Sequence, residues 1–153
     1  MNISPNAQMR LGVNVRLELT DKHGTILKTR ETKNLVVAVG RDLVIEMLGG
    51  TVHAEPTHLA LGTSSVTQTD SDTSLGAEQG RYIITRRRSF TSRIQYQLFL
   101  DTTQGNGYTY TEAGLFNVRA GVSKLFARTT FEGVVKDSST NLTVSWDITL
   151  TSN

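Results

Sequence analysis

Apolar and polar residues alternate strictly near both ends of the chain. In the segment LTVSWDITL, residues 142–150, Val144, Trp146 and Ile148 occupy every second position, with a polar residue after each of them. Residues 11–19 follow the same pattern. A period of two is typical of a strand with one buried face. We therefore predict that Val144, Trp146 and Ile148 face a hydrophobic core.

Further apolar segments recur along the chain and are separated by turn residues. The sequence DKHG separates two of them, which predicts a β-hairpin over residues 9–33. Short strands divided by Gly, Asn, Asp and Ser indicate an all-β fold. At 153 residues the chain is long enough for one core. We predict a single antiparallel β-sandwich domain, jelly-roll-like, over residues 1–153.

Three segments depart from the alternation that is typical of strands. In the first, Leu43 and Met47 are four residues apart and two glycines follow Leu48, which predicts one short α-helix near residues 37–48. The other two segments, residues 1–8 and 63–74, contain few residues that a hydrophobic core could bury. We predict a flexible N-terminal segment at 1–8 and a polar loop or arm at 63–74.

The region 81–100 carries the most concentrated basic feature of the sequence. Its apolar residues lie at even positions, but arginine occupies positions 86 and 88, which predicts two strands with a bulge, a turn or a departure from the core between them. We interpret Arg86, Arg87, Arg88 and Phe90 as a subunit interface, because arginine is frequent in interfaces. Nucleic-acid binding is the less favoured alternative. Side chains alternate between the two faces of a strand, so Arg87 would point away from Arg86 and Arg88 and the basic cluster would be divided.

The composition excludes several kinds of site. The chain has no cysteine, so it forms no disulfide and offers no thiol nucleophile or thiolate metal ligand. Its formal net charge of +2 gives only weak attraction to polyanions. No apolar run approaches the roughly 20 residues that cross a bilayer, and the first residues lack the basic start and apolar stretch of a secretory signal. We expect a protein made in the cytoplasm, with no membrane partner.

The sequence HAEPTH contains residue types that bind metals. His53, Glu55 and His58 could offer two imidazoles and a carboxylate. Their spacing matches no standard ligand pattern, and Pro56 interrupts it. We therefore expect a polar loop here, and no metal or other cofactor.

The sequence YTYTEAGLFN, residues 108–117, resembles part of an active site but has a structural interpretation. As a strand it would place Tyr108, Tyr110 and Glu112 on one face. We predict that Glu112, Gly114 and Phe116 form a sheet corner, in which Glu112 accepts backbone N–H groups. Catalysis by a carboxyl group needs a partner acid, base or metal, and the sequence marks none. No catalytic residue is predicted.

Several segments of the chain resemble those of a known family. They are, in order, HLALGTSSV, TDSDTSLGAE, YTYTEAGLFN, KLFARTTF and LTVSWDITL. Together they resemble uncharacterised virion proteins of tailed bacteriophages that are often described as tail-fibre-like or structural. The resemblance spans about residues 34–151. It implies a non-enzymatic protein of the virion, made in the cytoplasm of the bacterial host, that acts in repeated copies bound to other virion proteins.

Four functions follow as alternatives. Capsid decoration and stabilisation, through contacts between homo-oligomer subunits and the major capsid protein, is the favoured one. A tail component, such as a fibre, collar or baseplate protein, is the alternative. A carbohydrate-binding module would use Tyr108, Tyr110 or Trp146 as stacking platforms, and a hydrolase of the cell envelope would use Glu112.

Overall fold

The protein is described here by a computed structural model that covers residues 8–152. Most of the N-terminal segment predicted at 1–8 lies outside the described residues. The strands and the helix are, in chain order, β1 (Met9–Asp21), β2 (Ile26–Lys33), β3 (Leu35–Val36), α1 (Ala38–Leu48), β4 (His58–Gly62), β5 (Glu78–Ile83), β6 (Arg86–Phe90), β7 (Arg93–Leu100), β8 (Tyr108–Arg119), β9 (Val122–Lys136) and β10 (Thr140–Ser152).

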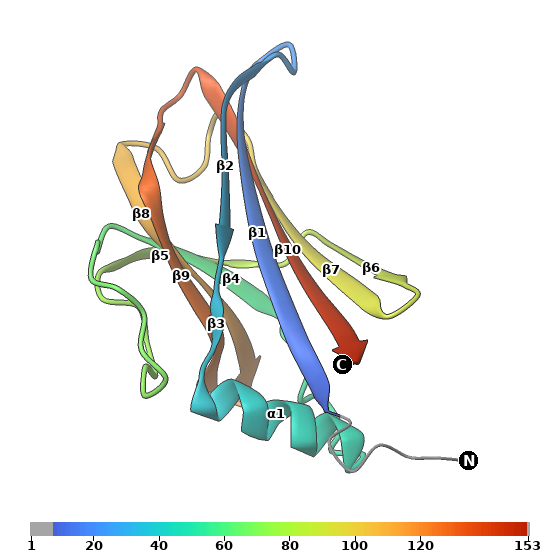
Figure 1. The fold of residues 1–153 in the computed structure, drawn as a ribbon. Coiled ribbons are helices and arrows are strands. Elements are labelled where there is room, and N and C mark those ends of the chain that lie inside the picture. Colours follow the sequence, from blue (N-terminus) through green and yellow to red (C-terminus); the bar gives the residue numbers. More distant parts are fainter. Residues whose placement is uncertain (1–7, 153) are drawn as a thin grey trace.

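The strands form two antiparallel sheets that pack face to face (Figure 1). Sheet A has the strand order β2-β1-β10-β7-β6, and sheet B has the order β3-β9-β8-β4-β5. The predicted all-β sandwich with one short helix is therefore confirmed. The predicted hairpin over 9–33 is also present, because β1 and β2 pair directly.

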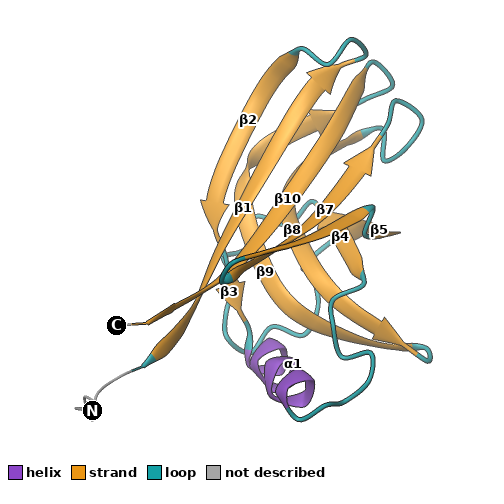
Figure 2. Ribbon diagram, turned by 90° about the vertical axis from the view of Figure 1, so that its right-hand side faces the viewer, coloured by secondary structure: helices purple, strands orange, loops and turns teal. Residues whose placement is uncertain are grey.

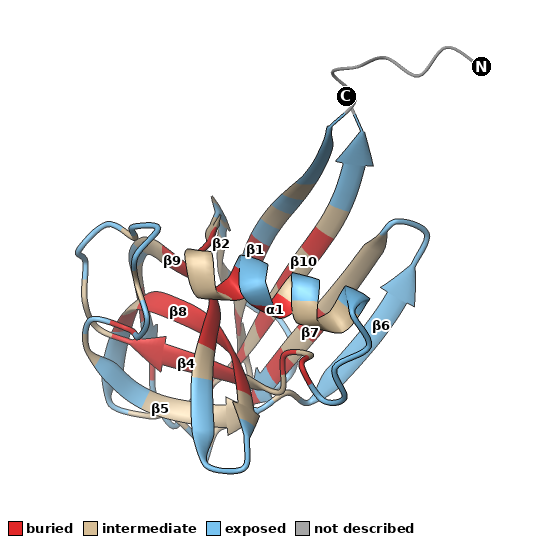
Figure 3. Ribbon diagram, turned by 90° about the horizontal axis from the view of Figure 1, so that it is seen from below, coloured by how far each residue is buried: buried red, intermediate tan, exposed pale blue. Residues whose placement is uncertain are grey.

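The strictest alternation in the sequence produces the central strands of sheet A. β1 and β10 pair along their whole lengths, from Met9 opposite Ser152 to Asp21 opposite Thr140. Val144 and Trp146 are fully buried and Ile148 is nearly so, all within the core between the sheets. The paired ends near the two termini extend beyond the body of the sandwich, where their residues become exposed (Figure 3).

Helix α1 covers the lower end of the sandwich (Figure 2). It buries Leu43 in the core and packs against β9 so closely that Gly40 lies directly over the backbone of Phe126. A side chain at position 40 would overlap the Phe126 carbonyl. The helix ends where the Gly49 N–H bonds to the Ile45 carbonyl oxygen, at 2.9 Å. The range agrees with the predicted helix near 37–48.

The region 81–100 forms three strands in place of the predicted two. β5 ends at Ile83 in sheet B, and after two residues β6 begins in sheet A. The chain thus crosses from one sheet to the other at the point where the even-numbered apolar series breaks. This crossing, one of the departures expected, explains why arginine is accommodated at positions 86 and 88. Neither position continues the half-buried face of β5.

The two sheets are held together along one edge and diverge along the other. Arg30 on β2 forms an ion pair with Glu132 on β9, at 3.2 Å, and the hydroxyl oxygens of Thr32 and Thr129 lie 3.3 Å apart. At the opposite edge β6 diverges from sheet B (Figures 1 and 3). Sheet A therefore ends in an exposed edge strand.

Candidate interaction surfaces

Glu112 lies in the middle of β8 and is completely buried. Its carboxylate accepts backbone N–H bonds from Ser64, Gly76 and Ala77, at 3.2, 2.9 and 2.7 Å. The side chain thus accepts backbone N–H groups as the sequence predicted. The groups come from the loop of residues 63–77, which covers the outer face of sheet B.

Arg128 on β9 is the charged partner of Glu112. Its side chain is 3% exposed, and Nε and Nη2 donate to the Glu112 carboxylate at 3.0 and 2.8 Å. Nη1 donates to Asp72 at 2.9 Å, and Nη2 also donates to the Val66 carbonyl oxygen. Burial lowers the pKa of Arg128, but the bonds to Asp72 and Glu112 raise it by more. The guanidinium joins two sheet strands to the polar loop.

These contacts define how the polar segment 63–74 lies on the sandwich. Besides the buried network, an exposed ion pair between Arg41 of α1 and Asp70 attaches the loop to the helix. Leu75, just after the segment, is buried over Gly114, where a side chain would collide with it. The segment is a surface loop fixed to sheet B at several points (Figure 1).

The predicted corner at Glu112, Gly114 and Phe116 is wrong, because β8 continues through all three residues. The pairing of β8 with β9 shifts register between Tyr110 and Glu112, as a β-bulge does. This shift also separates Tyr110 from Glu112, since Tyr110 faces the main core while Glu112 faces the loop. Phe116 packs in a small second core that includes Leu75.

Glu112 is unsuited to the role of a general acid in an envelope hydrolase. Its carboxylate is fully buried, and loop N–H groups and Arg128 occupy its oxygens. A substrate in solution cannot reach it while the loop stays in place. Glu112 therefore has a structural role, because its hydrogen bonds join the loop to sheet B.

Lys136 is a second buried charge with a structural role. It is fully buried at the end of β9, and Nζ donates to the Asp101 and Asp137 carbonyl oxygens and to Asn106 Oδ1, at 2.9, 3.0 and 2.7 Å. Burial lowers its pKa, and the nearby Asp137 and Asp101 carboxylates oppose this. The three donors of the ammonium group each have an acceptor, so Lys136 joins the loop after β7 to the turn after β9.

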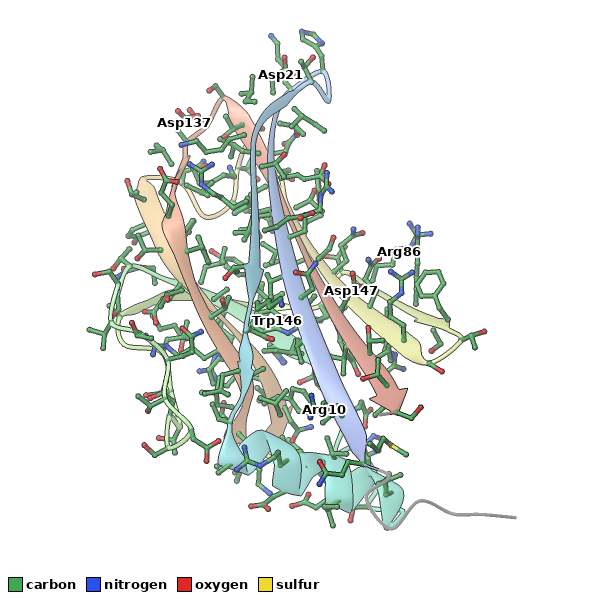
Figure 4. All side chains as sticks on the ribbon, viewed as in Figure 1. Arg10, Asp21, Arg86, Asp137, Trp146 and Asp147 are labelled. Atoms are coloured by element: carbon green, nitrogen blue, oxygen red, sulfur yellow. The ribbon has the colours of Figure 1, made fainter. Side chains whose placement is uncertain are left out.

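The aromatic residues considered for carbohydrate stacking are mostly inaccessible. Tyr110 is fully buried, and its hydroxyl donates to the Gly105 carbonyl oxygen at 2.7 Å. Trp146 is also fully buried between the sheets (Figure 4). Tyr108 alone of the three is exposed. The structure therefore contradicts the use of Tyr110 and Trp146 as stacking platforms.

The sequence HAEPTH does not form a metal-binding cluster. His53 Nδ1 lies 3.8 Å from Glu55 Oε1. His58 does not join this pair; its Nδ1 lies 2.8 Å from the Thr57 hydroxyl oxygen. Burial, with a contribution from Arg81, lowers the pKa of His58. Among residues 8–152, no group of three or more His, Cys, Asp or Glu side chains is arranged to hold a metal ion.

The basic segment predicted as an interface forms β6, the edge strand of sheet A. All five of its residues are exposed, and β6 pairs with β7 alone. Arg86 and Arg88 lie opposite Gln97 and Gln95 on the outer face, whereas Arg87 lies opposite the core residue Tyr96. Figure 4 shows Arg86 projecting at this edge. Within the described chain, none of the three arginines forms an ion pair.

An apolar groove lies between helix α1 and the end of sheet A next to β6. It has a volume of about 350 Å³. Its lining includes Val44, Met47, Ile94, Phe126, Ile148 and Leu150, with Ser89, Phe90 and Arg93 at the β6–β7 turn. The Arg93 guanidinium lies 4.1 Å from the centre of the Phe90 ring. The edge strand thus has exposed cations along it and apolar surface at one end.

Comparisons with known proteins find no matching family model, curated protein or solved structure. No helix among residues 8–152 is long and apolar enough to span a membrane. The resemblance to virion proteins that was drawn from the sequence motifs therefore stays a prediction. What the structure adds is the position of the exposed basic strand and the apolar groove.

Sequence reasoning missed Arg128 and Lys136 as buried charges. Both lie in β9, which spans Val122–Lys136. For Arg128 a signal was available: in LFARTTF it follows three apolar residues that are all buried. A charge in such a segment requires a partner of opposite sign. Glu112, which is followed by the apolar residues of AGLF, was the matching candidate.

Proposed function

We propose that this chain is a non-enzymatic structural protein of a tailed bacteriophage virion, and that it decorates and stabilises the capsid. The observation that supports this most is that some charged side chains are buried and bonded within the protein, whereas others are exposed on one edge strand. The buried charges Glu112, Arg128 and Lys136 form internal bonds that fix loops. In contrast, Arg86, Arg87 and Arg88 are exposed on an edge strand beside an apolar groove, and none of them has an ion-pair partner among residues 8–152. Exposed apolar surface with charged neighbours is typical of a protein-binding site.

Repetition explains how a small subunit could stabilise a shell. A contact of modest area contributes little in one copy, but many copies arranged by symmetry act together, because each bound subunit also holds its neighbours. The partners in this proposal are other copies of the chain and the major capsid protein. The place of action is the virion, after synthesis in the cytoplasm of the bacterial host.

The fixed loops suit such a role. A partner surface that is already ordered loses less conformational entropy on binding. The loop of residues 63–77 is held by Glu112 and Arg128, and the loops at the other end are held by Lys136. These loops are therefore held in one arrangement before any partner binds.

The test is the copy number of the protein in purified particles, measured by quantitative mass spectrometry, together with the stability of shells. Capsid decoration predicts hundreds of copies in each particle, and predicts that shells assembled without the protein are disrupted at higher temperature once it is added. A few copies, found only with purified tails, would support the tail alternative. Absence from purified particles would refute the proposal.

A further inference from the structure

The edge of β6 offers unpaired backbone groups to a partner. An edge strand presents N–H and C=O groups that another extended segment can bond, and proteins use this mode for peptide recognition. β6 pairs on one side with β7, from Arg86 opposite Gln97 to Phe90 opposite Arg93. Its other side borders no strand within residues 8–152. All five of its residues are exposed.

The charges on β6 determine which segment fits. Arg86 and Arg88 share the outer face, and neither has an acidic partner in the described chain. A second copy of β6 would place arginine against arginine, and like charges on adjacent strands repel. A segment with carboxylates at alternate positions would instead pair each arginine with an opposite charge.

The other face of the added segment would meet Arg87 and, beyond it at Ser89, apolar surface. Side chains alternate along a strand, so residues between the carboxylates point to the inner face. On that side Ser89 borders the groove lined by Met47, Ile94 and Ile148. Apolar side chains there would leave water without displacing any part of the core.

We propose that β6 binds an extended acidic segment of a partner protein as a sixth strand of sheet A. Carboxylates of the segment pair with Arg86 and Arg88, and alternate apolar side chains enter the groove beside α1. The proposal deepens the proposed function, on which it rests for the source of the partner, a neighbouring virion protein. The binding itself is a property of the isolated chain and is tested separately.

A single-stranded nucleic acid is the competing ligand for exposed arginines. It would need aromatic faces for base stacking along a basic groove. Phe90 is the aromatic residue of β6, and the Arg93 guanidinium already lies 4.1 Å from its ring centre. The inner face of the strand points toward an apolar groove. These features favour an acidic polypeptide.

The experiment measures binding of capped synthetic peptides to the folded protein by calorimetry. The probe is a strand-length peptide of about six residues with alternating valine and glutamate. Three analogues test each part of the proposal: lysine replaces glutamate, serine replaces valine, or alternate backbone nitrogens are methylated to remove N–H donors. Each analogue should bind at least about tenfold more weakly than the probe, since charge pairing, apolar burial and strand pairing all contribute.

The matched variants compare the two edges of sheet A. Replacing Arg86→Glu and Arg88→Glu together should weaken probe binding at least about tenfold. Replacing Lys22→Glu, in the β1–β2 turn, and Lys33→Glu, at the end of β2, changes the net charge equally at a distance from β6 and should alter binding by no more than about twofold. Lys22 and Lys33 are both exposed. Thermal unfolding checks that both double variants stay folded, and the peptide analogues need no variant at all.

Several results would overturn the proposal. The absence of probe binding at millimolar concentration would do so. Equal binding of the methylated analogue and the probe would also do so, because strand pairing would then be excluded. Tighter binding of a thymidine oligonucleotide than of the probe would assign the edge to nucleic acid. Self-association lost in the Arg86→Glu, Arg88→Glu variant would assign it to a second copy. A protein that binds the probe but is missing from particles would refute the virion role and leave this inference standing.

Discussion

Replacement of Arg128 tests the buried network most directly. Its guanidinium donates at 3.0 and 2.8 Å to Glu112, at 2.9 Å to Asp72 and at 2.9 Å to the Val66 carbonyl oxygen. Arg128→Met keeps a long unbranched side chain but removes every one of these donors. The Glu112 carboxylate would then stay buried with backbone N–H groups as its remaining partners.

The expected cost is large because the charges are buried. Breaking a buried ion pair by removing one partner costs ~3–5 kcal/mol. In a domain of this size 1 kcal/mol corresponds to about 2–4 °C, so the melting temperature should fall by roughly 6–20 °C. Arg41→Met is the matched control, because Arg41 binds Asp70 in the same loop with both side chains more than half exposed. The control should lower the melting temperature far less than Arg128→Met does, because solvent screens an exposed ion pair.

The assay is unfolding in urea followed by the fluorescence of Trp146, the one tryptophan in the chain and a fully buried one. A double variant, Glu112→Gln with Arg128→Met, removes both charges. It should be more stable than the sum of the two single losses predicts, by ~1–3 kcal/mol. The reasoning is refuted if Arg128→Met destabilises no more than Arg41→Met, or if the two losses simply add.

Three further predictions concern other contacts. Gly40→Ala should lower the free energy of unfolding in urea by ~1–3 kcal/mol, because the added methyl group would overlap the Phe126 carbonyl. Gly12→Ala is the control and should lower it less, because its methyl group would meet no atom closer than 3.8 Å. Lys136→Met should destabilise, since it leaves buried acceptors unpaired, and amide exchange in the loop after β7 should accelerate. Burial raises the pKa of Asp72, but hydrogen bonds from neighbouring groups lower it by more, to below the usual 3.8. Its contribution to stability is thus present above about pH 4 and lost as the pH falls further, so the acid-induced fall in melting temperature should be shallower in Asp72→Asn.

Much of the fold follows from local patterns in the sequence. The alternation at 142–150 predicted a strand with Val144 and Trp146 inside, and the structure has both buried in β10. The spacing of Leu43 and Met47 predicted the helix, which spans Ala38–Leu48. A period of two or of about four residues is set by backbone geometry, so it can be detected without knowing any partner strand.

The errors arose where partners are distant in the chain. The corner predicted at 112–116 is a continuous strand, because a bulge opposite β9 changes which face Glu112 points to. The crossing between sheets after Ile83 appeared in the sequence only as a break in alternation. Such features depend on how two strands align, and alignment is not encoded in the residues of either strand alone.

The sequence by itself determined that this is a β-sandwich with a small helix, because burial with period two is a local property of each strand. Only the tertiary structure decided that Glu112 contacts Arg128, and that three arginines lie on an exposed edge strand beside an apolar groove with no ion-pair partner in the part of the chain that the structure describes. The physical reason is that a buried charge needs an opposite charge or a hydrogen-bond partner, and the fold determines which group lies next to it. That neighbour is fixed by strand order and register, which belong to the whole chain.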